Sequence, residues 1–451
     1  MPTIFATTPE ADYSPFVLAG VLLTLVVIYL ASKLGGELSK RLDLPPVLGE
    51  LVGGVVVGIS ALHLIVFPET GAAGTDSVVM TVLQWLGHLD ATAITHIFQS
   101  QSEVISVLAE LGVIVLLFEI GLESDLRELG KVGSQAAVVA VVGVAAPFAL
   151  GTVGLVTLFH VPLIPAIFAG AALTATSIGI TSKVLSELGH LKSTEGQIIV
   201  GAAVIDDVLG IIVLAVVASL AKTGEVDLLN VVYLIVSASA FLLGAILLGK
   251  FFNQSFVAIA DKLQTRGALL IPAFTFALAM AFLANIIHLE AILGAFAAGL
   301  VLDETDKRKE LDQQVMPIAD ILVPIFFVTV GAKADLSVLN PMVAENRAGL
   351  IIATFLIAVA IIGKVITGWA VVGKPGVNRL AIGVGMIPRG EVGLVFAGIG
   401  SASGVLDKPL EAAMIVMVIL TTFLAPPLLQ WVLKGQEESI PTGNTTLSTV
   451  E

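Results

Sequence analysis

The chain has 451 residues, of which 57% are hydrophobic and 13% are charged, and its formal net charge is −14. Soluble proteins carry about 25% charged residues, so this composition indicates a helical protein that crosses a membrane many times. The net negative charge argues against nucleic acid as a partner, and the absence of cysteine excludes disulfides and thiolate metal sites.

Thirteen apolar segments are long enough, or nearly long enough, to cross a bilayer as helices. The predicted fold is therefore an all-α polytopic membrane protein. In chain order the segments cover residues 15–37, 45–62, 103–122, 132–159, 163–187, 195–221, 228–252, 266–287, 290–303, 316–332, 348–373, 378–401 and 409–433.

The two ends of the chain and one long connection lie outside these segments. Residues 1–14 have no basic stretch, so the first apolar segment is expected to be retained rather than cleaved as a signal peptide. The polar tail, residues 435–451, is expected to be disordered. The connection 61–102 contains a weakly amphipathic stretch, 78–98, that is expected to lie on the membrane surface.

The basic residues between the segments fall mostly on one side of the predicted membrane. Of the 22 Lys and Arg residues, two lie deep within segments, and the other 20 lie in connections or in the terminal turns of segments. A non-cytoplasmic N-terminus places 16 of these 20 on the cytoplasmic side and 4 on the opposite side. Cytoplasmic connections carry an excess of Lys and Arg, so the bias predicts a non-cytoplasmic N-terminus and a cytoplasmic C-terminus. The four basic residues on the non-cytoplasmic side are Lys222, Lys333, Arg347 and Lys408. The two deep within segments are Lys364 and Arg389.

Two pairs of short sequences indicate an internal repeat. Residues 47–58 (VLGELVGGVVVG) align without gaps with residues 292–303 (ILGAFAAGLVLD), and 121–126 (GLESDL) aligns with 331–336 (GAKADL). Each match joins two segments that are seven positions apart in the order of segments. Because successive segments cross the membrane in opposite directions, an odd offset means that the two copies enter it from opposite sides. Segments 1–6 and 8–13 are therefore predicted to form two inverted six-helix repeats, an organisation common among secondary transporters.

The fifth segment of each predicted repeat carries a helix-breaking pattern. Residues 173–182 (LTATSIGITS) cluster hydroxyl groups within an apolar span, with Thr174, Thr176 and Ser177 as the candidate ligands. Residues 385–395 (GMIPRGEVGLV) contain Pro388, which lacks an amide donor. We expect an interruption at both places, where freed carbonyls and hydroxyls could coordinate a cation, although a hydroxyl in a membrane helix often bonds back to the i−4 carbonyl instead.

Two adjacent carboxylates, Asp206 and Asp207, lie in the middle of the sixth segment with no neighbouring cation. A charge at the bilayer centre costs roughly 2.5–3.5 kcal/mol, so the pair is expected to be functional. Lys364, in the eleventh segment, is the candidate partner for one of them; the alternative is that it extends to the membrane surface. Arg389 and Glu391 are expected to pair locally and to support the broken helix, with a role in gating as the alternative.

Carboxylate, hydroxyl and carbonyl oxygens suit a small, hard cation. A carboxylate binds Na⁺ or H⁺ but not both, and this competition is sufficient for exchange. With Lys364 charged, the net charge of the site formed by the two Asp and the Lys is −1 when no ion is bound. It is 0 with one bound Na⁺ and +1 with two bound protons. Exchange of two protons for one Na⁺ would then move charge, whereas a permanent pair between Asp206 and Lys364 would leave a one-for-one exchange.

Two other function classes are weaker alternatives. An intramembrane aspartyl hydrolase needs two Asp residues from different helices, and here the two are adjacent. A cation channel is compatible with two broken helices, but a binding site that can be neutralised favours a carrier.

The motifs TATSIGITSKVLSELG, GAAVIDDVLG, EAILGAFAAGLVL, the buried Gly363–Lys364 and IPRGEVGLV together resemble the cation/proton antiporter-2 family. The Asp-Asp motif with a membrane-embedded Lys resembles its electrogenic Na⁺/H⁺ subgroup. The glutathione-gated K⁺ members usually carry a C-terminal nucleotide-binding domain, and its absence from this sequence counts against that subgroup. K⁺/H⁺ exchange stays an alternative within the family.

This resemblance implies a secondary antiporter, not an enzyme, that needs no cofactor beyond the transported Na⁺ (or Li⁺) and H⁺. It implies a homodimer in a bacterial inner membrane or another energised membrane. Within the transmembrane domain, 15–434, core helices of about 132–221 and 348–433 would carry the ion by an elevator movement against a dimerisation scaffold. Asp207 would bind the ion and proton, with Asp206 and Thr176 as further Na⁺ ligands and Lys364 as the counter-charge.

Overall fold

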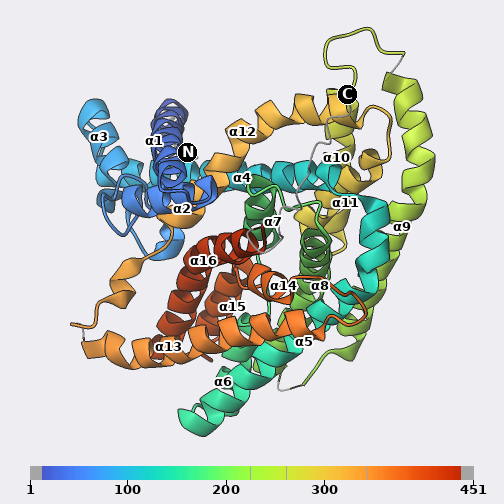
Figure 1. Cartoon of the computed structure of the whole chain (residues 1–451). Coiled ribbons are helices and arrows are strands. Elements are labelled where there is room, and N and C mark those ends of the chain that lie inside the picture. The colour runs from blue at the N-terminus through green and yellow to red at the C-terminus, as the bar shows by residue number, and fades with distance from the viewer. Residues whose placement is uncertain (1–12, 224, 261, 343, 438–451) are drawn as a thin grey trace, which may run out of the picture. The chain divides into compact units, whose positions relative to one another are not determined.

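The computed structural model describes residues 13–437 except 224, 261 and 343, and within them every regular element is a helix (Figure 1). Residues 1–12 and 438–451, which hold most of the two terminal segments, lie outside the described residues. The long α-helices that contain or extend the expected segments are α1 (Ser14–Arg41), α4 (Ala91–Glu123), α5 (Leu126–Leu158), α8 (Thr194–Thr223), α9 (Leu228–Ala260), α12 (Arg308–Ala332), α13 (Ala344–Val365) and α16 (Lys408–Glu437).

The shorter helices account for the remaining segments and for part of the connection 61–102. They are α2 (Pro46–Val57), α3 (Val78–Gly87), α6 (Leu163–Ala172), α7 (Ile178–Glu187), α10 (Leu270–Ile286), α11 (Ala291–Asp303), α14 (Arg379–Gly385) and α15 (Glu391–Ala402), with the 3₁₀ turns Pro68–Thr70, Gly74–Asp76, Leu336–Leu339 and Ile366–Ala370. Each of the thirteen expected segments is thus helical. Among the described residues, eight helices are long and apolar enough to cross a bilayer unaided.

The stretch 78–98 differs from the single surface piece expected. His88, in a left-handed conformation with φ of 47°, ends α3, and Asp90 then accepts a hydrogen bond from the amide of Ala93 at 2.7 Å. A carboxylate that caps the first turn stabilises a helix start, so α4 begins at Ala91, before its apolar part. One side of this stretch is buried, with Met80 and Ile97 fully enclosed.

The chain divides into two compact units. One comprises Met1–Arg41, Leu48–Val113 and Ala319–Ser337; the other comprises Leu42–Val47, Ile114–Ile318 and Val338–Glu451. In the second unit α5 packs on α8, α6 and α13, and α13 packs on α16 (Figure 1). A buried cluster that includes Phe168, Phe396 and Met417 fills the space among these helices.

The glycines of the aligned repeat sequences make equivalent contacts. In the first unit, a β-carbon on Gly54 of α2 would lie 2.3 Å from the Val328 carbonyl and 2.9 Å from the Gly331 α-carbon of α12. In the second unit, a β-carbon on Gly299 of α11 would lie 2.3 Å from the Phe118 carbonyl of α4 and 2.8 Å from the Gly121 α-carbon.

Both contacts place two backbones too close for any side chain. Gly54 aligns with Gly299, and Gly331 aligns with Gly121. The second segment of each repeat therefore packs on the third segment of the other repeat, as the predicted inverted repeat requires.

Candidate functional site

The two interrupted segments of the second unit meet at their interruptions. The first break separates α6 from α7 at residues 173–177, and the second separates α14 from α15 at residues 386–390. The amide of Ser177 donates to the carbonyl of Pro388 at 2.8 Å. A β-carbon on Gly390 would lie 2.9 Å from Ser177 Oγ, so glycine permits this approach. Both breaks predicted from the sequence are present, and they are in contact.

Hydroxyl groups on the first segment bond to carbonyls of the second. Thr176 Oγ1 donates to the Met386 carbonyl at 3.2 Å, and Thr181 Oγ1 donates to the Gly385 carbonyl at 2.9 Å. Thr174 Oγ1 instead donates to Ala171 of its own helix at 2.7 Å. The crossing thus uses Thr176 and Thr181 to satisfy acceptors at the C-terminal end of α14.

Arg389 joins the two breaks through its side chain. Its guanidinium is fully buried and donates to the carbonyls of Leu173 at 2.6 Å, Ala175 at 2.9 Å and Met386 at 3.4 Å. These carbonyls follow the last turns of α6 and α14. A helix C-terminus carries about −0.5 of a charge, so one guanidinium offsets roughly the two ends together.

The face of α8 that carries Asp206 packs against both breaks. Positions i−7 and i+4 share a helix face, and for Asp206 these are Ile199 and Gly210. A β-carbon on Gly210 would lie 3.8 Å from the β-carbon of Ala175. Ile199 Cδ1 would lie 2.6 Å from a β-carbon on Gly385. The Asp206 face of α8 is therefore held beside the crossing.

Asp206 and Lys364 form a buried ion pair. Lys364 Nζ donates to Asp206 Oδ2 at 3.0 Å, and both side chains are 0% exposed. Lys364 thus neutralises an Asp and does not extend to the surface. Gly143 of α5 leaves the room for this arrangement, since a β-carbon there would lie 3.2 Å from Nζ.

Asp207 is also buried, with 5% of its surface exposed, but its surroundings differ from those of Asp206. Successive residues of a helix point about 100° apart. The ion pair that the structure gives Lys364 is with Asp206 Oδ2. The second unit therefore brings two carboxylates, a Lys and an Arg together in a region with almost no exposure to solvent.

Comparison with known proteins identifies the family. The profile described as sodium/hydrogen exchanger, transmembrane, matches residues 21–435. The chain belongs to the sodium/hydrogen exchanger family. The predicted resemblance to Na⁺/H⁺ antiporters is confirmed, although the matched family is described as sodium/hydrogen exchanger and not as cation/proton antiporter-2.

Two relatives and one solved structure are close to this exchanger. It is 62% identical over 433 residues to the high-affinity Na⁺/H⁺ antiporter NhaS3 of Synechocystis sp., covering 96% of this chain and 94% of that protein. It is 32% identical over 421 residues to the Na⁺/H⁺-K⁺ antiporter GerN of Bacillus cereus, covering 92% and 97%.

The structure of the sodium proton antiporter MjNhaP1 from Methanocaldococcus jannaschii matches with a TM-score of 0.61 at 16% identity, over 95% of this chain and 99% of that chain. The predicted antiporter fold is confirmed, and this exchanger is an integral membrane protein.

Among the described residues, the hydrogen bonds of the Arg389 side chain go to carbonyls of the two breaks, and the local pair expected with Glu391 stays a prediction. Glu391 begins α15, and its side chain lies outside the described part of the chain.

Two contacts at the edge of the site were not anticipated from the sequence. Thr422 Oγ1 on α16 donates to the Arg389 carbonyl at 2.6 Å. Glu195 Oε1 accepts from the Asn378 amide at 2.8 Å, and the Asn378 side chain in turn caps α14. The helical pattern of α16 gave no signal for Thr422, whereas Asn before Arg379 is a recognisable helix start.

Proposed function

We propose that this chain is a secondary active Na⁺/H⁺ antiporter in which Asp206 and Asp207 bind the cation or protons in competition. One observation carries the proposal: Asp206, which forms a buried pair with Lys364 of α13, lies on the α8 face that packs against two interrupted helices. Family membership supports ion exchange over hydrolysis or passive conduction.

Asp207 is the proposed primary ligand of the ion. Its carboxylate is buried beside Asp206, and the ion pair with Lys364 already occupies Asp206 Oδ2. Thr176 Oγ1 uses its proton on the Met386 carbonyl, so its oxygen lone pairs are left to face a cation. The hydroxyl of Thr174 bonds within its own turn and is the weaker candidate.

Competition follows from the charge of the site. Arg389 is balanced by the helix ends that it contacts, so Asp206, Asp207 and Lys364 set the charge of the site. That charge is −1 when empty and 0 with one Na⁺. A buried net charge resists transfer through a low-dielectric region, and a neutral site does not. The site loaded with one Na⁺ therefore moves more readily than the empty one.

Lys364 determines how many protons are exchanged. We propose that the pair with Asp206 opens during the cycle, so that two protons replace one Na⁺ and net charge crosses the membrane. If the pair stayed closed throughout, the exchange would be one-for-one and electrically silent. A measurement of charge movement distinguishes the two.

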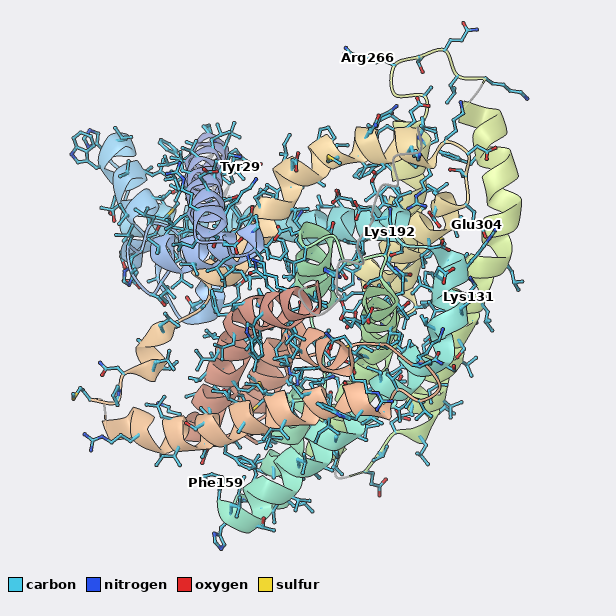
Figure 2. All side chains as sticks on the ribbon, in the orientation of Figure 1. Tyr29, Lys131, Phe159, Lys192, Arg266 and Glu304 are labelled. Atoms are coloured by element: carbon cyan, nitrogen blue, oxygen red, sulfur yellow. The ribbon has the colours of Figure 1, made fainter. Side chains whose placement is uncertain are left out.

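The proposed topology places one end of the helices of the second unit on the cytoplasmic side. Figure 2 shows Lys131 near the start of α5 and Phe159 at its other end, with Lys192 and Glu304 on the side of Lys131. The charge of Lys192 acts on Asp303, which also forms an ion pair with Arg308. This charged end is the proposed cytoplasmic end.

The proposed transport movement uses the helices expected to form the core. Residues 132–221 and 348–433 lie entirely within the second unit. We propose that they carry the site by an elevator movement, and that the chain works as a homodimer in an energised membrane.

The test is transport by the purified chain in proteoliposomes with an imposed pH gradient, with Na⁺, Li⁺ and K⁺ added in turn. We expect uphill Na⁺ uptake driven by protons, and its loss in Asp207→Asn, with Glu50→Gln on α2 as a variant of an acidic residue outside the site. Downhill flux that ignores the pH gradient would contradict antiport, and full exchange by Asp207→Asn would contradict the assigned ligand.

A further inference from the structure

Two adjacent threonines of α16, Thr421 and Thr422, are both buried in the second unit. Each hydroxyl lies 2.7 Å from a carbonyl one turn earlier, Met417 for Thr421 and Val418 for Thr422. Thr421 bonds only to carbonyls of its own helix among the described residues. Thr422 also lies 2.6 Å from the carbonyl of Arg389, in the second break.

The hydroxyl of Thr422 has one proton, so it can donate to only one of these two carbonyls at a time. Both distances are ideal for a hydroxyl donor. The Val418 carbonyl belongs to the helix, where the amide of Thr422 is its regular partner. The Arg389 carbonyl belongs to a break, where the regular partner of a helix is missing. The Arg389 carbonyl therefore needs the hydroxyl donor more than the Val418 carbonyl does.

Arg389 is one of the residues that join the two breaks. Its side chain holds the carbonyls of Leu173 and Ala175, and Ala175 packs on α8 next to the turn that carries Asp206. Thr422 holds the backbone of the same residue. A chain of contacts thus runs from α16 through Arg389 and the first break to the carboxylates.

We propose that Thr422 is a positioning residue for cation binding: its hydroxyl fixes the Arg389 backbone on α16 and so sets the geometry of the oxygens that converge on the ion. This inference rests on the proposed function. Cation binding requires several oxygens in one arrangement, whereas a proton requires one carboxylate oxygen. Loss of the hydroxyl therefore weakens Na⁺ binding and leaves proton binding nearly intact.

The consequence is a specific kinetic signature. Without the Thr422 hydroxyl, the KM for Na⁺ rises by about tenfold, the change that corresponds to one lost hydrogen bond, while kcat changes little. Because protons then compete more effectively against Na⁺, the acidic limit of activity at fixed Na⁺ moves to higher pH. Loss of structure alone would lower kcat and the amount of active protein without this shift.

The experiment compares Thr422→Val with Thr421→Val in proteoliposomes across Na⁺ concentrations and pH. Both changes replace a buried hydroxyl by a methyl group of similar size, and each removes a hydroxyl that lies 2.7 Å from a carbonyl of the preceding turn. We expect the rise in KM and the pH shift in Thr422→Val alone, and their reversal in Thr422→Ser, which restores the donor.

Equal KM values and pH limits in the two valine variants would overturn the proposal, as would a Thr422→Ser variant that behaves like Thr422→Val. If Thr422→Val does not assemble, Thr422→Ala is compared with Thr421→Ala on the same two readouts. The unmodified protein is the check on the proposed function. If it does not exchange Na⁺ for H⁺, that function fails, whereas exchange without a difference between the threonine variants refutes the positioning role alone.

Discussion

Removal of Lys364 leaves Asp206 buried without its cation. Lys364→Met replaces the Lys by an apolar side chain of similar length. Among the described residues, Asp206 Oδ1 has no hydrogen-bond partner and Oδ2 bonds to Lys364. Breaking a fully buried pair by removing one partner typically costs about 3–5 kcal/mol. Protonation of Asp206 limits that cost, since a neutral acid is far less costly to bury than a carboxylate.

The double variant Asp206→Asn/Lys364→Met separates stability from transport. Replacing both members of a buried pair is often nearly neutral, because the desolvation of two charges is removed together with their attraction. We therefore expect thermal stability in detergent to fall strongly in Lys364→Met and to return close to the original value in the double variant.

Transport by Lys364→Met is expected to become electrically silent. With Asp206 protonated and Lys364 absent, Asp207 alone exchanges one Na⁺ for one H⁺. Electrodes or a voltage-sensitive dye on proteoliposomes measure the charge that moves per Na⁺. Charge movement unchanged from that of the original protein would refute the part assigned to Lys364, and a double variant less stable than Lys364→Met would refute the assigned energetics.

Two other changes test the crossing and the space beside it. Arg389→Gln removes the charge that offsets two helix ends. We therefore expect the rate of Na⁺/H⁺ exchange at a fixed pH gradient to fall at least tenfold. A rate within twofold of the original would contradict the role of Arg389. Gly143→Ala places a methyl group 3.2 Å from Lys364 Nζ, whereas a β-carbon on Gly133 of the same helix would meet nothing within 4 Å. We expect Gly143→Ala to lower thermal stability and raise the KM for Na⁺ while Gly133→Ala does neither, and equal behaviour of the two variants would show that the space near Lys364 is not limiting.

The positions of the breaks and the need for a counter-charge were predictable from single residue types. Pro388 lacks an amide, and the hydroxyl cluster at residues 173–182 is unusual in an apolar span, so both interruptions were found. A Lys and two Asp in apolar segments must find partners, so pairing was expected. Which Asp pairs with Lys364 depends on the rotation of α8 about its axis, and the even apolar character of that segment does not fix this rotation.

The contacts of Arg389 and Thr422 could not be predicted from the sequence either, and the reason is a different one. Glu391 is the nearest acidic residue in the sequence, so sequence proximity favours a local ion pair over bonds to the carbonyls that a broken helix leaves without amide partners. Those acceptors lie more than 200 residues away in the sequence, at Leu173 and Ala175. Thr422 resembles any helical threonine that bonds to the preceding turn, and its second acceptor is evident only from the fold.

The glycine contacts between the repeats bear on how the chain is assembled during synthesis. Gly54 of α2 meets its backbone partner only when α12 has been made, and Gly299 of α11 requires the earlier α4. The Gly54 face of α2 therefore enters the membrane before its backbone partner on α12 exists. Each repeat completes this glycine contact only with a helix of the other repeat, so the close packing of α2 on α12 has to wait for the second half of the chain.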